Sequence, residues 1–338
     1  MQHIPVTILT GFLGSGKTTL LRHLLEDPAF TDTALIVNEF GEVGIDHLLV
    51  ADLAENIVEL RDGCLCCSIR GDLVMTLRDL WQRRCLDEVP AFARVVVETT
   101  GLADPVPLIH TLMANAPLMK VYRLDAVVCV LDAQHGGATL TAHDTALRQL
   151  ALADIVVLSK TDLVDAAASA DLLARLADIN PRAERIEAVH GEVKPTRILD
   201  RGLFQPAPCA SDVGAWWGGR DESAARAVAT DHAHVHDHGA EYATHIIRHA
   251  TPLSLAGTAV FLNRVVNLFA DDILRIKGIA AFRDKGDAPA VLHAVQGKFY
   301  PVVWLDSWPD TDHDSRLVFI GRHLDTARID ELFAALCV

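Results

Sequence analysis

The sequence predicts an α/β protein with a mostly parallel sheet flanked by helices, followed by a smaller α+β domain. In residues 1–205, short apolar runs rich in β-branched residues alternate with amphipathic stretches, which is typical of strands covered by helices. Residues 206–242 break this pattern with proline, glycine and a histidine-rich polar stretch, and are expected to form a linker. Strand-like and helical patterns resume over residues 243–338, the expected second domain.

Hydrophobic periodicity predicts the elements of each domain. Those of the first domain are strands at Val6–Leu9, Ala34–Val37, Arg94–Val97, Val127–Leu131, Ile155–Leu158 and Arg185–Ala188, and helices at Thr18–Glu26, Leu73–Arg84 and Ala166–Ile179. Those of the second are strands at Thr244–Arg248, Ala290–Gln296, Tyr300–Leu305 and Leu317–Gly321, and helices at Gly257–Phe269 and Ala327–Leu336. The second sheet is expected to be mostly antiparallel.

The charge balance narrows the class of partners. The chain carries 45 acidic and 30 basic residues, a formal net charge of −15, which disfavours nucleic acid and anionic membrane surfaces. No apolar run reaches the length of a membrane span, and no basic leader is visible. Seven cysteines, three of them crowded together, do not resemble a secreted disulfide framework, so we expect a cytoplasmic protein.

Gly11 begins a glycine-rich segment that matches the phosphate-binding pattern G-x-x-x-x-G-K-[ST], between an expected strand and an expected helix. The glycines let backbone N–H groups turn inward around phosphate oxygens. Lys17 is expected to reach the β- and γ-phosphates, and Thr18 to offer its hydroxyl to Mg²⁺. A chance glycine-rich turn is the alternative. The expected nucleotide contacts here are Gly11, Gly14, Ser15, Gly16, Lys17, Thr18 and Thr19.

A second acidic signal follows the expected strand at Arg94–Val97. Glu98 would hold Mg²⁺ through water at the strand end, and the N–H of Gly101 would contact the γ-phosphate and sense its loss. Between these motifs, residues 38–46 contain Glu42 and Asp46, either of which could reach Mg²⁺ or orient water; a solvated acidic loop is the alternative. The catalytic candidates are therefore Lys17, Glu42 and Glu98.

Residues 159–162, Ser-Lys-Thr-Asp, resemble the guanine-specifying motif N-K-x-D. The carboxylate of Asp162 would accept hydrogen bonds from guanine N1–H and the 2-amino group, a donor pair that adenine lacks. The stem of Lys160 would lie along the base. Ser159 replaces asparagine and has fewer hydrogen-bonding groups, and a strand-to-helix cap is the alternative interpretation. The segment around His190 is placed to add a backbone contact to the base.

Together with residues 38–42, 63–67, 98–105, 274–278 and 296–297, these motifs resemble the CobW-like GTPases, which are related to the nickel chaperones of hydrogenase and urease. The resemblance covers nearly the whole chain. It implies a GTPase domain, a C-terminal CobW domain, and a role in metal insertion or metal homeostasis.

Two segments could bind a transition metal. Cys64, Cys66 and Cys67 supply thiolates, which favour Zn²⁺ or Co²⁺, also Cu⁺, with Ni²⁺ a weaker candidate. Three thiolates leave one position open, which suits a protein that passes its metal on. Buried structural thiols and a redox role are the alternatives. In the linker, four histidines could capture metal weakly or belong to a polar linker: His232, His234, His236 and His238.

The leading hypothesis is a GTP-hydrolysing metal chaperone that delivers Zn²⁺ or Co²⁺ to a client metalloprotein in a nucleotide-dependent way. The alternatives are a GTP-dependent assembly factor whose metal is only structural, and a small-molecule kinase. Intrinsic turnover is expected to be slow, because the sequence offers no obvious arginine finger or water-positioning glutamine. A client, or a second copy in a homodimer, could supply one.

Overall fold

The computed structural model describes residues 3–37, 57–59, 69–201, 242–309 and 311–337. The chain divides into two compact units: residues 1–176 with 185–205, and residues 177–184 with 206–338. Across the described ranges, no helix is both long enough and apolar enough to cross a membrane.

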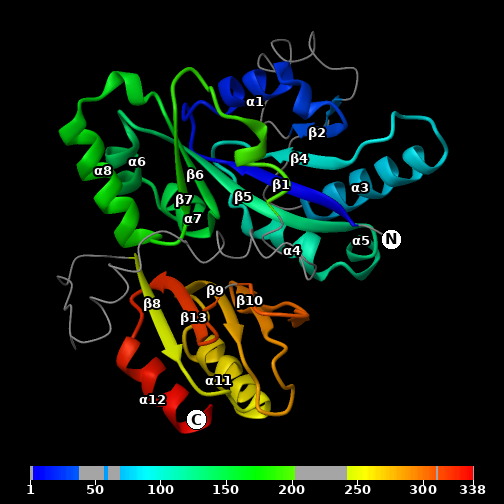
Figure 1. Cartoon of the computed structure of the whole chain (residues 1–338). Helices are drawn as coiled ribbons and strands as arrows, with labels where there is room; N and C mark the ends of the chain where they lie inside the picture. Colours follow the sequence, from blue (N-terminus) through cyan, green and yellow to red (C-terminus); the bar gives the residue numbers. More distant parts are fainter. Residues whose placement is uncertain (1–2, 38–56, 60–68, 202–241, 310, 338) are drawn as a thin grey trace. The chain divides into compact units, whose positions relative to one another are not determined.

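The first unit is built on a seven-stranded sheet with the order β3-β2-β4-β1-β5-β6-β7 (Figure 1). Its strands are β1 (Ile4–Thr10), β2 (Thr33–Val37), β3 (Ile57–Glu59), β4 (Arg94–Glu98), β5 (Tyr122–Asp132), β6 (Ile155–Ser159) and β7 (Glu184–Ala188). Neighbours from β3 to β6 pair in parallel. All seven residues of the central strand β1 are buried, which explains its mostly apolar sequence.

Helices flank this sheet (Figure 1). They are α1 (Lys17–Glu26), α3 (Ile69–Cys85), α4 (Val106–Ala114), α5 (Ala116–Met119), α6 (Gly136–Ala142), α7 (Asp144–Leu152) and α8 (Ala166–Ile179), with 3-10 turns η1 (Pro28–Phe30), η2 (Thr161–Leu163) and η3 (Pro195–Arg197).

The parallel register brings four strand ends to one edge of the sheet. Leu9 of β1 lies opposite Glu98 of β4, and Asp132 of β5 lies opposite Ser159 of β6. The loop that follows β1 therefore begins between β4 and β5, and β6 lies one strand further along the sheet. Ligands of open parallel sheets bind at this carboxyl edge, so the fold itself marks where a site is expected.

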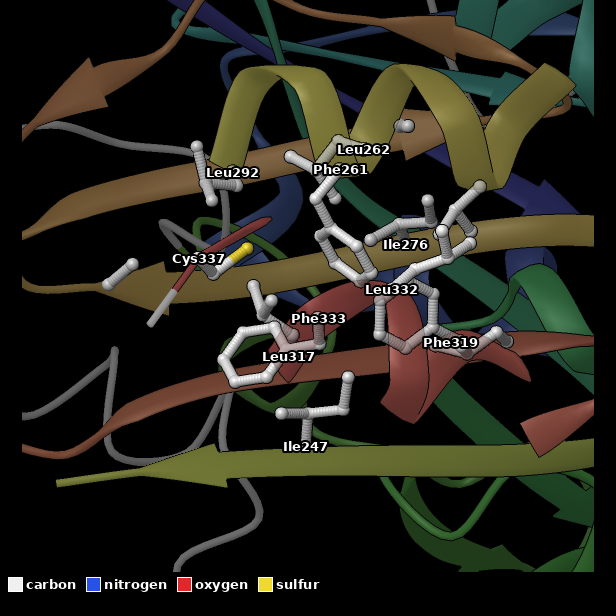
Figure 2. Close-up of a cluster of buried hydrophobic side chains, with 14 of the residues drawn as sticks. Ile247, Phe261, Leu262, Ile276, Leu292, Leu317, Phe319, Leu332, Phe333 and Cys337 are labelled. Atoms are coloured by element: carbon white, nitrogen blue, oxygen red, sulfur yellow. The ribbon is translucent and has the colours of Figure 1, made fainter. Parts of the chain in front are cut away.

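The second unit contains a six-stranded sheet with the order β11-β10-β9-β13-β8, and β12 pairs with β10. Its strands are β8 (Tyr242–His249), β9 (Ile273–Ala280), β10 (Ala290–Val295), β11 (Lys298–Phe299), β12 (Val303–Trp304) and β13 (Ser315–Arg322), and its helices are α11 (Leu255–Leu268) and α12 (Thr326–Leu336). The strand pairs are antiparallel. Figure 2 shows the core, where Phe261, Phe333 and Phe319 pack edge to face between helices and sheet.

The predicted fold class is confirmed, and α8 has the predicted bounds. The prediction of one strand over Tyr300–Leu305 was wrong: only Val303–Trp304 is strand there, and the preceding strand ends at Phe299. Pro301 lies between them and has no N–H to donate to a ladder. Sequence reasoning did not assign a strand to β9, whose buried residues include Arg275 and Lys277 and so interrupt the apolar pattern.

Candidate functional site: a phosphate loop at the carboxyl edge of the sheet

The loop between β1 and α1 is shaped by glycines with positive φ angles. Gly11, Gly14 and Gly16 have φ values of 140°, 72° and 96°. A Cβ on Gly11 would overlap the carbonyl oxygen of Val130, so this position accepts only glycine. Gly16 is the N-cap of α1 and starts the helix in the left-handed region. The loop therefore closes tightly over the end of β1 and leads directly into the helix N-terminus.

Side-chain donors hold the carbonyl groups of this loop. The ammonium of Lys17 donates to the carbonyls of Gly11 (2.8 Å) and Phe12 (3.3 Å). Lys160 donates to the Gly14 carbonyl at 2.9 Å. The hydroxyl of Ser159 donates to the Ser15 carbonyl at 2.5 Å. In a trans peptide the next N–H points opposite to the carbonyl, so the loop presents N–H groups on its other side, as an anion-binding loop requires.

Lys160 is itself held by a buried carboxylate. Its ammonium lies 2.6 Å from Oδ2 of Asp132 at the end of β5. The other oxygen, Oδ1, accepts hydrogen bonds from the backbone N–H groups of Gln134 (2.8 Å) and His135 (3.1 Å). Burial raises the pKa of Asp132, but the Lys160 bond and the two amides outweigh it, so this pKa lies below its ordinary value. Asp132 is thus ionised at neutral pH and fixes Lys160 against the loop.

The residues predicted to contact a base lie beside the loop. Asp162 is exposed in η2, and His190 is exposed with a φ of 51°. A Cβ on the following Gly191 would lie 2.8 Å from the carbonyl oxygen of Thr19, so this turn lies against the first turn of α1. A pocket of about 160 Å³ borders the loop, lined by Phe12, Leu13, Gly14, Ser15, Leu131, Asp132, His135, Gly136, Thr139 and Lys160.

The end of β4 is tied to the end of β1. The hydroxyl of Thr99 donates to that of Thr10 at 3.0 Å, and the Thr99 N–H donates to the carbonyl of Leu9 at 2.9 Å. Glu98 is buried, with only 8% of its surface exposed. Within the described residues, the hydroxyls of Ser15 and Thr100 are buried and have no hydrogen-bond partner. A buried carboxylate and unmatched hydroxyls in one region fit a hard cation and phosphate oxygens.

Residues Gly101–Ala103, which follow β4, lie against the loop and are hydrogen-bonded to α7. A Cβ on Gly101 would lie 2.6 Å from the backbone nitrogen of Leu13, so the two segments are in close backbone contact. The side-chain amide of Gln149 donates to the carbonyls of Gly101 (3.2 Å) and Ala103 (3.0 Å). Sequence reasoning missed Gln149; the available signal was a lone amide in the apolar end of a helix, Leu147–Leu152.

Several predicted residues fall outside the described part of the chain: Glu42, Cys64, Cys66, Cys67, His232, His234, His236 and His238. Within the described ranges, no group of three or more His, Cys, Asp or Glu side chains is arranged to hold a metal ion. Thr18, in the first turn of α1, is half-buried.

A parallel sheet whose central strand enters a glycine-rich loop and a helix, with a buried acid ending the neighbouring strand, defines a P-loop nucleotide-binding protein. Residues 5–187 match the family model of the CobW/HypB/UreG nucleotide-binding domain, and residues 242–337 match the cobalamin synthesis protein cobW C-terminal domain. The chain therefore belongs to the CobW family, as its motifs suggested.

Named relatives and a solved structure agree with this assignment. The chain is 32% identical to the zinc chaperone YjiA of Escherichia coli (strain K12) over 99% of both chains. It is 34% identical to the zinc chaperone CobW of Pseudomonas aeruginosa, over 97% of this chain and 90% of that protein. The crystal structure of Zn(II)-bound YjiA GTPase from E. coli superposes with a TM-score of 0.74 at 28% identity, covering 99% of both chains.

Proposed function

We propose that this chain is a GTP-hydrolysing metal chaperone that binds Zn²⁺ or Co²⁺ at Cys64, Cys66 and Cys67 and passes it to a client metalloprotein. The observation that carries the nucleotide half is the phosphate loop, whose carbonyls are held by Lys17, Lys160 and Ser159. The metal half is supported by relatives named zinc chaperones across nearly the whole chain. We place this activity in the cytoplasm and retain residues 206–242 as the linker between two domains.

In this proposal the loop N–H groups and the ammonium of Lys17 bind the β- and γ-phosphates of GTP. Asp162 reads guanine, Lys160 lies along the base, and the turn at His190 adds a backbone contact. Thr18 and Glu98 would hold Mg²⁺, which supplies charge neutralisation on the phosphate oxygens. Gly101 senses the γ-phosphate, and Glu42 orients the attacking water. Turnover by the isolated chain is slow.

The proposed metal site is coupled to the nucleotide through the chain that joins them. The cysteines follow residues 38–46 in sequence and precede Glu98, so γ-phosphate binding can align the three thiolates, and hydrolysis can release the ion. Such coupling typically amounts to about 1–3 kcal/mol, or roughly 5–150-fold in affinity. The histidines at 232–238 are proposed as a weaker capture site.

The test is the affinity for Zn²⁺ and Co²⁺ measured with Mg²⁺ and a non-hydrolysable GTP analogue, and again with GDP. We expect tighter metal binding with the analogue. Replacing Cys64, Cys66 and Cys67 together by serine should abolish tight binding and leave nucleotide binding intact. Cys85→Ser is the matched control, since Cys85 is an exposed free cysteine. Deleting residues 231–238 separates the two candidate metal sites.

Equal metal affinities in the two nucleotide states would exclude the coupling. If binding of a client then followed the nucleotide while the metal stayed bound, the chain would be a GTP-dependent assembly factor with a structural metal. A phosphorylated small-molecule product would instead indicate a kinase.

A further inference from the structure

One buried side chain connects a helix of the first unit to the segment proposed to sense the γ-phosphate. Gln149 lies on α7 with 0% of its surface exposed. Its Nε2 donates to the carbonyls of Gly101 and Ala103, at 3.2 Å and 3.0 Å. Because both neighbours are acceptors, the nitrogen must face them, so the orientation of the amide is settled by its contacts.

The same segment is in backbone contact with the phosphate loop. A Cβ on Gly101 would lie 2.6 Å from the nitrogen of Leu13 and 2.8 Å from its Cα. Only a residue without a Cβ therefore allows the two backbones to lie this close. The carbonyl held by Gln149 belongs to this same residue, so the amide determines how closely the segment lies against the loop.

The adjacent residue of α7 strengthens the arrangement. The guanidinium of Arg148 lies 3.5 Å from Oδ2 of Asp104 and donates from Nε to Asp144 at 2.7 Å. The other oxygen of Asp104 accepts the backbone N–H of Val106, the first residue of α4, at 2.9 Å. Two consecutive residues of α7 thus hold the carbonyls and the carboxylate of one turn.

Burying the amide of Gln149 costs free energy, so filling space is not enough to account for this residue. Within the described part of the chain, its Oε1 is buried and has no hydrogen-bond partner. An unmatched buried acceptor is destabilising, and a methionine of similar shape would fill the same space without it. The two donated bonds are the gain that offsets this cost.

We propose that Gln149 is a positioning residue that holds Gly101–Ala103 against the phosphate loop and so sets how strongly the chain prefers GTP to GDP. The inference rests on the proposed GTPase function. GDP uses the loop and the base-binding residues, which Gln149 does not touch. Only a γ-phosphate needs the N–H of Gly101 in place, so loss of Gln149 should weaken GTP binding and hydrolysis selectively.

The experiment compares the wild-type chain with Gln149→Met, which keeps the shape and removes the donor, and Gln149→Glu, which replaces the donor by an acceptor facing two carbonyls. Gln82→Met is the matched control, because Gln82 is an exposed residue on α3. Affinities for a non-hydrolysable GTP analogue and for GDP are measured by calorimetry with Mg²⁺, and kcat is measured for GTP. Thermal unfolding reports folding of each variant.

We expect Gln149→Met to reduce the ratio of GTP-analogue to GDP affinity about fivefold, the effect of one hydrogen bond of ordinary net strength. GDP affinity should stay within about twofold of wild type, and Gln149→Glu should lower the ratio at least as far. A folded Gln149→Met with an unchanged ratio and unchanged kcat would overturn the inference and leave Gln149 a structural residue. A wild-type chain that neither hydrolyses GTP nor distinguishes it from GDP would instead refute the proposed function.

Discussion

Ser159 provides the sharpest test of the phosphate loop, because it stands where the guanine motif has asparagine. Its hydroxyl is buried and donates to the Ser15 carbonyl at 2.5 Å, with the Leu131 carbonyl more distant at 3.4 Å. A hydroxyl has one proton, so the shorter contact is the bond that matters. Ser159→Ala removes this proton and leaves the loop carbonyl buried without its donor.

Leaving a buried carbonyl without a donor costs about 1–3 kcal/mol. In the variant, the Ser159 hydroxyl no longer holds the loop, so GDP must order the loop when it binds. Part of the free-energy cost of the missing hydrogen bond will therefore appear as weaker GDP binding. We expect GDP affinity to fall about 5–30-fold. The unfolding temperature of the nucleotide-free chain should fall as well.

The assay is calorimetric titration of GDP with Mg²⁺, together with thermal unfolding of wild type and variant. Ser307→Ala is the matched control, because Ser307 is exposed. We expect the control to bind GDP with wild-type affinity. A Ser159→Ala chain with unchanged GDP affinity and unchanged unfolding temperature would show that the loop does not depend on this hydroxyl.

Three further outcomes follow from the structure. Gly11→Ala should lower stability by several kcal/mol, measured by thermal unfolding, because its φ is 140° and the added Cβ would overlap the Val130 carbonyl. Gly137→Ala should be neutral or slightly stabilising, because an added Cβ would have no atom within 4 Å. Asp132→Asn should weaken GDP binding at about pH 7, and the difference in affinity between wild type and variant should persist down to about pH 5, because the lowered pKa keeps the Asp132 carboxylate charged there; a difference that disappears above about pH 5 would contradict this. Burial, followed by the charges of Arg275 and Lys277, holds the pKa of His293 well below its ordinary value. As the pH falls, the imidazole is therefore protonated in the unfolded chain before it is protonated in the folded chain. The free energy of unfolding should fall below about pH 6.5 in wild type, and less steeply in His293→Gln.

The parts of the site that sequence reasoning identified are contiguous motifs. The loop from Gly11 to Thr18 and the strand that ends at Glu98 were predictable because strand, turn and helix signals follow one another along the chain. The supporting contacts were not predictable in this way. Ser159 reaches Ser15 across 144 residues, and Gln149 reaches Gly101 across 48. Only the parallel register of the sheet and the packing of α7 bring these groups together.

Ser159 and Gln149 also differ in a way that one experiment can separate. Ser159 supports a carbonyl of the loop proposed to bind the phosphates of GDP and GTP alike, whereas Gln149 supports a segment that only the γ-phosphate would contact. Ser159→Ala should therefore weaken GDP and the GTP analogue by similar factors, and Gln149→Met should weaken only the analogue. In the double variant the two losses multiply for the analogue if the two segments respond independently, and a departure from the product measures their coupling through the contact between Gly101 and Leu13. The measurement is one set of four calorimetric titrations per nucleotide: wild type, both single variants and the double variant. If Ser159→Ala changed the ratio of GTP-analogue to GDP affinity as strongly as Gln149→Met, the phosphate loop and residues Gly101–Ala103 would move together. The proposal that Gln149 acts on the γ-phosphate alone would then be wrong.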